Sequence, residues 1–340
     1  MTLVIADNAP LKAFNSFGVT AHARRLVHLT DARDLDRALD ALCHEPARLV
    51  LGAGSNVLFA GDFEGTVLRM ETVGCALAGE EDGDPVACAA AGQDWDGFVR
   101  WTLAQGLAGL ENLAMIPGTV GASPIQNIGA YGLEMRERFH SLGAVRIADG
   151  TRREFSPTEC AFGYRDSLFR HSPGQWLITE VRFKLSRGAA PRTGYADLRD
   201  ELSRRGTGAA PSANEIADAV RTVRARKLPD PKVLGNAGSF FKNPHVDPAL
   251  ASELAERHPG LPVWPEGERA KLSAAWMIEC CGWKGHRDGD AGVHASHALV
   301  LVNHGTASGA QILALAARIR ASVLERFGVT LQIEPVVIAA

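Results

Sequence analysis

Arg48-Leu-Val-Leu-Gly-Ala-Gly-Ser-Asn-Val-Leu-Phe59 is the stretch of sequence that decides the fold. Its first four residues predict a short apolar strand, and its last three predict a second strand directly after the glycines. A dinucleotide-binding Rossmann unit would open a helix at this point, so that fold is excluded. The loop itself consists of Gly52, Ala53, Gly54, Ser55 and Asn56. Its converging backbone N–H groups would suit a diphosphate, and a tight structural turn is an equal alternative.

A second glycine-rich stretch, residues 117–132, holds four glycines, two aliphatic hydroxyls and two amides. It fits neither a helix nor a regular strand, and loops of this length are usually functional or disordered. Its apolar members indicate order; they are Val120, Ile125 and Ile128. We therefore favour a second ligand-wrapping loop over a purely structural one.

Residues 235–244 read Gly-Asn-Ala-Gly-Ser-Phe-Phe-Lys-Asn-Pro. Ser239 offers a hydroxyl beside two aromatic rings, while Lys242 and Asn243 supply a cation and an amide. Small residues, one hydroxyl and one cation without an adjacent carboxylate indicate a site for an anionic or oxygen-rich ligand. A structural loop is the alternative at this stage.

Two further charged residues are candidates for the same chemistry. Arg165 lies in Phe-Gly-Tyr-Arg-Asp-Ser, residues 162–167. Its planar fork suits a carboxylate or a phosphate, but a solvated Arg165 offset by Asp166 is an equal alternative. Glu334 lies in a segment, 331–338, that we expect to be a strand. A lone strand glutamate is more often solvated than catalytic.

Helical and strand-like segments alternate along the chain. Capping residues and glycine or proline stops predict four of the helices, at Asp94–Gly106, Ser212–Leu228, Asp247–Gly260 and Ser308–Gly328. A helical apolar face over 31–43 predicts a fifth. Residues 178–185 are expected to form a further strand.

Composition places the chain among ordinary globular enzymes. It has 340 residues, 46% hydrophobic and 22% charged, and two or three domains are expected because single cores rarely exceed roughly 250–300 residues. The net charge of 36 − 39 = −3 gives no reason to expect nucleic-acid or membrane-surface binding. No apolar run reaches the roughly 18 residues of a membrane span, and the N-terminus does not resemble a signal peptide.

Cysteine and histidine usage argues against disulfides and metals. The six cysteines are scattered without a Cys-x-x-Cys pair, so reduced thiols in a cytoplasmic protein are expected. His294 and His297 have the spacing of metal ligands. No carboxylate or cysteine pattern completes a zinc site around them, so we expect no metal.

Taken together, the motifs resemble the UDP-N-acetylenolpyruvoylglucosamine reductase family over nearly the whole chain. Each motif alone is weak, but seven occur in the family's order with compatible spacing. They are Asn15–Val19, Leu51–Phe59, Ile116–Gly132, Phe162–Ser167, Lys227–Pro231, Gly235–Pro244 and Glu334–Pro335. Tyr195 in Gly-Tyr-Ala-Asp-Leu, together with Lys227, resembles the family's longer subtype, which has a substrate-covering tyrosine loop.

The resemblance implies an α+β fold. It consists of a two-lobed FAD-binding domain of the vanillyl-alcohol-oxidase/PCMH type and a C-terminal α+β substrate-binding domain. We expect the first lobe at 1–70 and the second at 71–211, with the strand at 329–340 returning to the second lobe. The substrate-binding domain is expected at 212–328. A monomer without membrane or nucleic-acid partners is expected.

The resemblance also implies a reaction. NADPH reduces FAD, and the flavin N5 then gives hydride to C3 of the enolpyruvyl ether of UDP-N-acetylglucosamine-enolpyruvate, which yields UDP-N-acetylmuramate for peptidoglycan. Ser239 matches the general acid that delivers a proton to C2. Arg165 and Glu334 match the groups that stabilise charge growing on the carboxylate side in the transition state.

Binding residues follow from the same matches. Those implied for FAD are Gly52, Ala53, Gly54, Ser55, Asn56, Gly118, Thr119, Gly121, Ala122, Ser123 and Tyr164. Those implied for the UDP-sugar and its phosphates are Tyr195, Lys227 and Asn243, with Arg224 and Lys284 as looser matches. The chain departs from the family at Ala53, where glycine is usual, and in its short tail after Glu334-Pro335.

Two other functions stay open on the sequence. The first is an oxidase of small alcohols or a sugar lactone on the same flavin scaffold. Such enzymes often tether the flavin through a histidine near the first glycine loop, and no histidine lies between His44 and His140. The second is a non-catalytic nucleotide-sugar binding protein, which the joint presence of Arg165, Ser239 and Glu334 disfavours.

Overall fold

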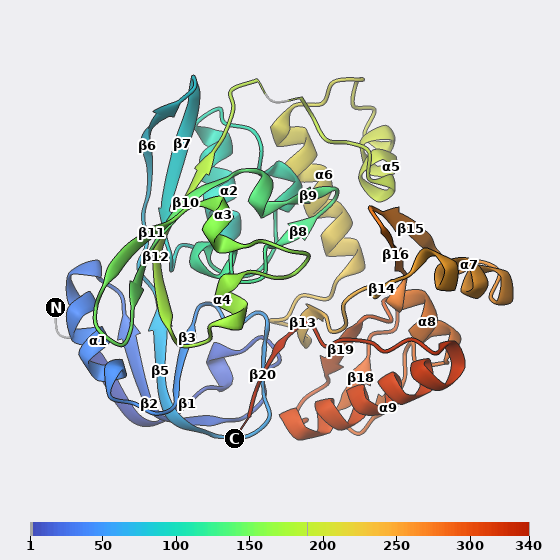
Figure 1. Cartoon of the computed structure of the whole chain (residues 1–340). Coiled ribbons are helices and arrows are strands. Elements are labelled where there is room, and N and C mark those ends of the chain that lie inside the picture. The colour runs from blue at the N-terminus through green and yellow to red at the C-terminus, as the bar shows by residue number, and fades with distance from the viewer. Residues whose placement is uncertain (1–2, 189, 340) are drawn as a thin grey trace. The chain divides into compact units, whose positions relative to one another are not determined.

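A computed structural model describes residues 3–188 and 190–339 (Figure 1). The chain divides into two compact units. Unit 1 comprises residues 1–9, 23–53 and 64–226, and unit 2 comprises residues 10–22, 54–63 and 227–340. Among the described residues, no helix combines the length and apolar character that crossing a membrane requires.

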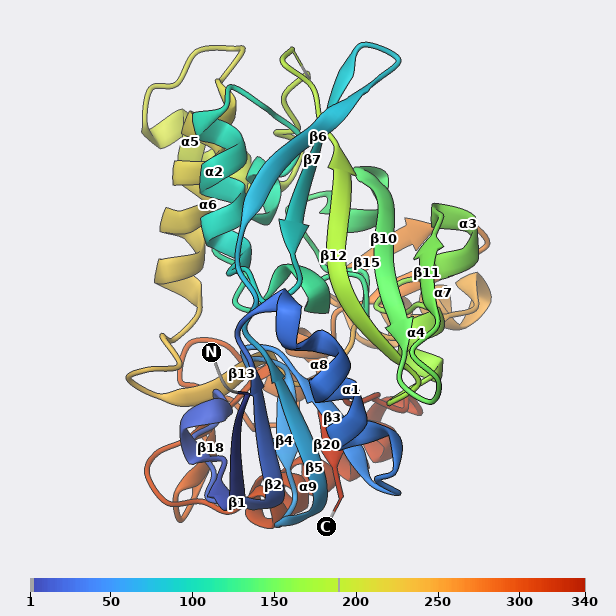
Figure 2. The same cartoon turned by 90° about the vertical axis from the view of Figure 1, so that its left-hand side faces the viewer.

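Unit 1 contains two larger sheets. The first has the order β1-β2-β5-β3, with bounds Val4–Pro10, His22–Leu29, Phe63–Met70 and Arg48–Leu51. The second has the order β11-β10-β12-β7-β6, with bounds Arg152–Phe155, Phe139–Arg146, Trp176–Lys184, Asp84–Ala90 and Cys75–Glu81. All four strand pairs of this second sheet are antiparallel, and Figure 2 shows the strands side by side. A short hairpin, β8 (Gly129–Ala130) and β9 (Leu133–Glu134), completes the strands of unit 1.

The helices of unit 1 include α1 (Leu35–Cys43), α2 (Trp95–Ala104), α3 (Pro157–Cys160), α4 (Leu168–His171), α5 (Ala196–Arg204) and α6 (Ala213–Lys227). An ion pair between Arg221 and Asp96, 3.0 Å long, joins α6 to α2. Trp95 and Phe98 of α2 pack edge-on or tilted against Phe183 of β12. The large buried rings of α2 thus help to anchor the start of this helix, to which the second glycine-rich stretch is hydrogen-bonded.

Unit 2 contains a sheet with the order β13-β19-β18-β17, bounded by Gly235–Ser239, Val300–Asn303, Ala291–Val293 and Arg287–Asp288. A second sheet has the order β14-β16-β15, bounded by His245–Val246, Arg269–Leu272 and Val263–Glu266. Its helices include α7 (Pro248–Arg257), α8 (Ala274–Cys280) and α9 (Gly309–Phe327). Gly309 lets α9 start close to β4 (Val57–Phe59), since a Cβ there would lie 1.8 Å from the Phe59 carbonyl oxygen.

The predicted helix starts are confirmed in detail. The Asp94 carboxylate accepts from Gly97 N, and Ser212 and Ser308 each form a reciprocal capping box, with Glu215 and Gln311. The strand expected at 178–185 is β12. The helix expected over 31–43 divides into a 3₁₀ turn, Ala32–Asp34, followed by α1.

The C-terminal segment differs from expectation. Only Val336–Ile338 forms a strand, β20, and it pairs in parallel with β4 rather than with the second lobe. Residues 332–334 lie along residues 240–242 instead, through one isolated bridge and two flanking backbone hydrogen bonds. Glu334 therefore precedes the strand and does not lie in it.

Candidate active site

The two glycine-rich loops meet in unit 1. A Cβ added to Gly52 would lie 2.6 Å from Thr119 Oγ1, so only a residue without a side chain permits this approach. Ala53 is exposed, and its φ is not in the positive region, which is why an alanine is accommodated there. Two segments predicted to bind the same cofactor are thus adjacent, and the missing side chain leaves the loop backbone accessible.

The second loop wraps around the start of α2. Gly118 O accepts from Trp95 N at 3.1 Å, and Val120 N and Gly121 N donate to Gln93 O and Ala91 O, each at 2.8 Å. A Cβ on Gly121 would lie 2.5 Å from that of Ala91. These contacts hold the loop in one conformation despite its glycines. The N–H groups of Val120 and Gly121 are thus used within the protein, and the binding of the FAD diphosphate by this loop stays a prediction.

Ala122 and Ser123 follow at the end of the 3₁₀ turn Val120–Ala122. The buried Ser123 hydroxyl donates to Val120 O at 2.7 Å. Its donor is therefore committed within the loop, so that any contact of this side chain with a cofactor would use the oxygen as an acceptor.

Arg165 is oriented by the same loop. Its Nη2 donates to Gly129 O at 2.5 Å, and its Nη1 lies 3.5 Å from Asn127 O. The guanidinium lies over the Tyr164 ring, 5.3 Å from its centroid. The backbone at Arg165 is left-handed, with φ +53°, a conformation that costs energy for a residue other than glycine. The two carbonyl oxygens orient the guanidinium of Arg165 and, being uncharged, do not neutralise it.

Asn127 joins the loop to the turn that carries Arg165. This fully buried side chain donates to Gly163 O at 2.9 Å and to Glu134 Oε2 at 3.1 Å. Its Oδ1 accepts from Arg136 N at 3.1 Å. The sequence contained one signal for this role, an amide within a glycine-rich stretch, but did not identify its partners.

Tyr195 and Arg224 converge on Tyr131, the penultimate residue of the second loop. The Tyr131 and Tyr195 rings pack edge-to-face with centroids 5.2 Å apart. Burial raises the pKa of Tyr131 to about 12, and the Arg224 guanidinium, which hydrogen-bonds the hydroxyl, opposes that rise. Arg224 Nε also donates to Met115 O at 3.2 Å. Burial lowers the pKa of the Arg224 guanidinium. A tyrosine–arginine–tyrosine group thus borders the loop.

Ser239 and Glu334 lie on adjacent segments of unit 2. Ser239 ends β13, after an irregularity in its pairing with β19, and Phe240 and Phe241 beside it are buried. Glu334 N donates to Phe240 O at 2.9 Å. The two buried rings, packed edge-to-face at 5.2 Å, hold the backbone on which the hydroxyl sits. The structure thus brings together two catalytic candidates that are far apart in sequence.

The remaining predicted residues of the first loop lie in unit 2. A Cβ on Gly54 would lie 2.0 Å from Phe14 O, and its φ of +68° also favours glycine. Ser55 O accepts from Ser16 Oγ at 3.3 Å, and Asn56 O accepts from Val336 N at 2.9 Å. These contacts anchor the end of the loop to a segment near the N-terminus and to β20.

The positive charges of Lys227 and Lys284 both affect the pKa of one histidine, His297. Burial lowers the pKa of His297, and the charges of Lys227, His294 and Lys284 lower it further. Its Nδ1 is buried and has no hydrogen-bond partner among the described residues. Lys284 is itself paired with Glu279, Nζ to Oε1 at 2.8 Å, which offsets part of the positive charge near His297. The sequence pointed to the lysines but not to His297.

Asn243 has a structural bond as well. Its Oδ1 accepts from Ala274 N at 3.0 Å, at the first residue of α8. The amide is therefore held with its oxygen toward the helix, and this fixes the direction of its NH₂ group. A ligand would meet Asn243 through its NH₂ group as a donor or through the second lone pair of Oδ1.

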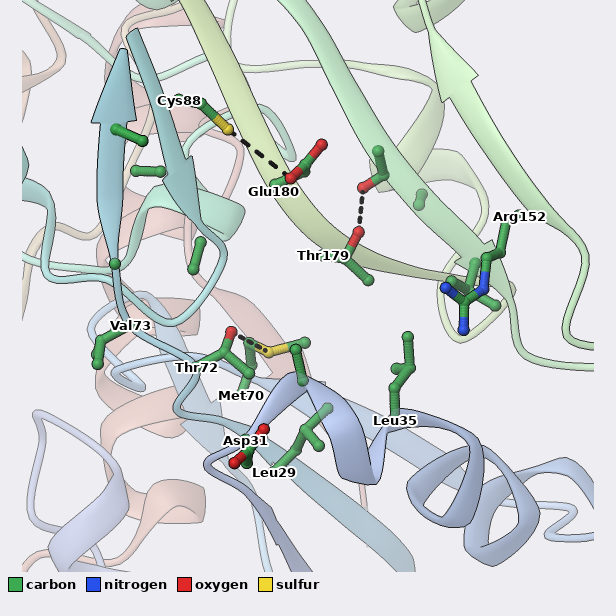
Figure 3. Close-up of a pocket in the computed structure, with 18 of the residues that line it drawn as sticks. Leu29, Asp31, Leu35, Met70, Thr72, Val73, Cys88, Arg152, Thr179 and Glu180 are labelled. Atoms are coloured by element: carbon green, nitrogen blue, oxygen red, sulfur yellow. Dashed lines mark hydrogen bonds between the residues drawn. The ribbon is translucent and has the colours of Figure 1, made fainter. Parts of the chain in front are cut away.

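A groove of about 920 Å³ opens elsewhere in unit 1. Figure 3 shows Leu35 and Met70 on one side of it and Thr179 and Glu180 on the other. Burial and the Glu180 carboxylate raise the pKa of Cys88, which borders the groove, to about 11. None of the residues predicted for catalysis, FAD or substrate lines it.

Comparisons with known proteins identify the family of the chain. The profile described as an FAD binding domain matches residues 23–156, and the profile described as the UDP-N-acetylenolpyruvoylglucosamine reductase C-terminal domain matches residues 230–338. The chain is 51% identical to the UDP-N-acetylenolpyruvoylglucosamine reductase of Azoarcus sp. (strain BH72), over 98% of each chain. It is 49% identical to that of Pseudomonas aeruginosa, over 98% of this chain and 99% of the relative.

A solved structure with that name is also similar. The enzyme of Thermus caldophilus aligns over 99% of each chain with a TM-score of 0.66 and 27% identity. The fold is thus an FAD-binding domain followed by the C-terminal domain of these reductases. The chain belongs to the UDP-N-acetylenolpyruvoylglucosamine reductase family.

Proposed function

We propose that this chain reduces the enolpyruvyl ether of UDP-N-acetylglucosamine-enolpyruvate to UDP-N-acetylmuramate, with its own residues in the roles given below. The observation that carries the proposal is the 51% identity to a named reductase over 98% of each chain. Members of the family are flavin-dependent oxidoreductases that use FAD and NADPH in peptidoglycan precursor synthesis. The two glycine-rich loops, residues 52–56 and 117–132, would hold FAD, which would supply hydride transfer from NADPH to C3 of the enolpyruvyl group.

Ser239 is the proposed proton donor. Reduction of the double bond needs one proton at C2 for each hydride at C3, and the Ser239 hydroxyl supplies it. A serine is a poor acid unless its surroundings favour ionisation. The buried phenylalanine pair after Ser239 supports this role because it holds the backbone that carries the hydroxyl.

Arg165 and Glu334 are proposed to stabilise the negative charge that grows on the carboxylate side as hydride arrives. Arg165 is suited to this because backbone carbonyl oxygens orient its fork. Glu334 assists only as the acid or when it shares a proton, since a second anion would repel the developing charge.

The substrate contacts are proposed at two places. Lys227 and Lys284, which both act on His297, suit the phosphates of the UDP-sugar. Tyr195 and Arg224, grouped around Tyr131, provide a second contact, and Asn243 a donor. The domain boundaries 1–70, 71–211 and 212–328, a monomeric state and a cytoplasmic location belong to the same proposal.

The experiment separates the two half-reactions by stopped-flow spectroscopy. Ser239→Ala is expected to leave flavin reduction by NADPH near normal and to slow flavin reoxidation by the enolpyruvyl substrate at least 100-fold, in the range of a lost general acid. Ser203→Ala, an exposed serine of α5, is the matched control. Equal loss in both half-reactions would argue against a proton donor.

Two outcomes with the unmodified protein would support other functions. Rapid reoxidation of the reduced flavin by oxygen alone would favour an oxidase. Tight binding of the UDP-sugar without NADPH consumption would favour a non-catalytic binding protein. Protein that cannot take up FAD would overturn the proposal as a whole.

A further inference from the structure

Residues 191–195, called the strap here, carry Tyr195 across the end of the second loop. A pocket of about 510 Å³ lies between strap and loop and is lined by Tyr131, Gly132, Pro191, Arg192, Thr193, Gly194 and Tyr195. Tyr195 is 47% exposed, so burial alone does not fix the position of its ring. The position of the Tyr195 ring therefore depends on its contact with the Tyr131 ring and on the residues that hold the strap backbone.

Asn112 holds that backbone. This side chain, 1% exposed in the 3₁₀ turn Glu111–Leu113, donates from Nδ2 to both Tyr131 O and Arg192 O, each at 2.9 Å. One amide group thus bridges the end of the second loop and the strap, which are far apart in sequence. Arg192 lies three residues before Tyr195, so the bridge restricts the position of the backbone that carries Tyr195.

The orientation of the amide is determined by its partners. An amide oxygen facing two carbonyl oxygens would be repelled, so the NH₂ group must point toward them. Asn112 Oδ1 is buried and has no hydrogen-bond partner among the described residues. No second bond therefore accounts for an amide at this position, and the two-carbonyl bridge is the contact that requires one.

A second tie at Arg192 is weaker. Its guanidinium contacts Glu137 at 2.5 Å and Gly132 O at 3.3 Å. Both charged side chains of the ion pair are more than a third exposed, and exposed pairs contribute little to stability. The buried bridge from Asn112 is the stronger constraint on the strap because its donors cannot turn to water.

We propose that Asn112 is a positioning residue for substrate binding, which fixes Tyr195 relative to the second loop. This inference rests on the proposed function, in which Tyr195 contacts the UDP-sugar. Asn112 itself touches neither substrate nor cofactor in this account. Its effect is to keep the strap in the conformation that the substrate binds, so that less ordering is needed on binding.

The test uses the full-length flavoprotein with Asn112→Asp. This change keeps the shape of the side chain but replaces the donating NH₂ by an oxygen facing two carbonyls. The KM for the enolpyruvyl-UDP-sugar is expected to rise roughly 10- to 30-fold, as for two lost hydrogen bonds, with kcat within about threefold. Flavin reduction by NADPH should be unchanged, a result that a general structural defect would not give.

Two controls make the result decisive. Thr102→Val removes another buried polar bond nearby, from Thr102 Oγ1 to Val99 O at 2.8 Å, and should leave the KM unchanged. In a Tyr195→Ala background, Asn112→Asp should add little to the KM, because the two residues act through one contact.

An unchanged KM in Asn112→Asp would overturn the inference, as would full additivity with Tyr195→Ala or equal slowing of the NADPH half-reaction. The proposed function is judged separately by turnover of the unmodified protein. A working reductase with an unaffected Asn112→Asp variant would therefore reject the bridge alone.

Discussion

At the scale of single residues, the proposed role of Arg165 depends on the shape of its guanidinium as much as on its charge. Lysine in its place keeps the charge but cannot reach two carbonyl oxygens and a substrate carboxylate together. For Arg165→Lys we expect roughly a 100-fold loss in kcat for the enolpyruvyl substrate, comparable to the loss of one transition-state donor. Flavin reduction by NADPH should be retained.

The matched control for this change is Arg136→Lys. Arg136 also donates to a carbonyl of the same turn, Phe162 O at 3.1 Å, but is exposed. It should retain nearly full kcat. If both variants lose the same activity, the fault lies in the turn and not in the proposed role of Arg165.

Gly52 gives a second test at this scale. A Cβ at 2.6 Å from Thr119 Oγ1 must push the two loops apart, and overpacking of this kind typically costs about 1–3 kcal/mol. Gly52→Ala should weaken FAD binding roughly tenfold, measured by quenching of flavin fluorescence. The double variant Gly52→Ala/Thr119→Ala should recover part of the lost FAD affinity, as a double-mutant cycle would show. Additive losses would show that the contact is not the cause.

At the scale of elements, the sequence was most reliable where the signal is local. The capping boxes at Ser212 and Ser308 and the Asp94 cap use residues three positions apart, and all three form. Local patterns could not show that residues 332–334 lie along residues 240–242, or that β20 pairs with β4. Strand partners are chosen by packing between segments that are distant in sequence.

The site shows the same division. The motifs identified Ser239, Arg165 and Glu334 as candidates, and the roles given to them are still predictions. They did not identify Asn112 or Asn127, whose importance arises from carbonyl groups brought to them by the fold. The spacing of the motifs could not predict the contact of Gly52 with Thr119, although both glycine loops were expected to bind one cofactor.

The capping box of α9 provides the prediction at this scale. Ser308 Oγ accepts from Gln311 N at 3.2 Å, and Gln311 Oε1 accepts from Ser308 N at 2.8 Å. Ser308→Ala should lower the stability by about 1 kcal/mol, seen as a lower midpoint in thermal unfolding. Ser252→Ala, an exposed helical serine of α7, should have almost no effect. Equal midpoints for the two variants would contradict the capping role.

For the molecule as a whole, three histidines of unit 2 link stability to pH. Burial lowers the pKa of His294, His297 and His304 from the ordinary value of 6.5. The charge of His304 lowers the pKa of His294 further. The charges of Lys227, His294 and Lys284 lower the pKa of His297. The charge of Arg287 lowers the pKa of His304, and the Asp290 carboxylate opposes this. The unfolded chain therefore binds protons on these rings more readily than the folded protein does.

The sign of the pH dependence follows from that difference. Their contribution to stability is complete above pH 6.5 and is lost as the pH falls through the lowered folded-state pKa values. The thermal midpoint of the wild type should thus fall from pH 8 to pH 5.5, and His297→Gln should reduce that fall. Any loss of packing in the variant appears equally at pH 8, so the difference between the two pH values isolates the protonation of His297. An unchanged pH dependence in His297→Gln would show that this imidazole binds its proton equally well in the folded and unfolded chain, which would contradict the lowered pKa of His297.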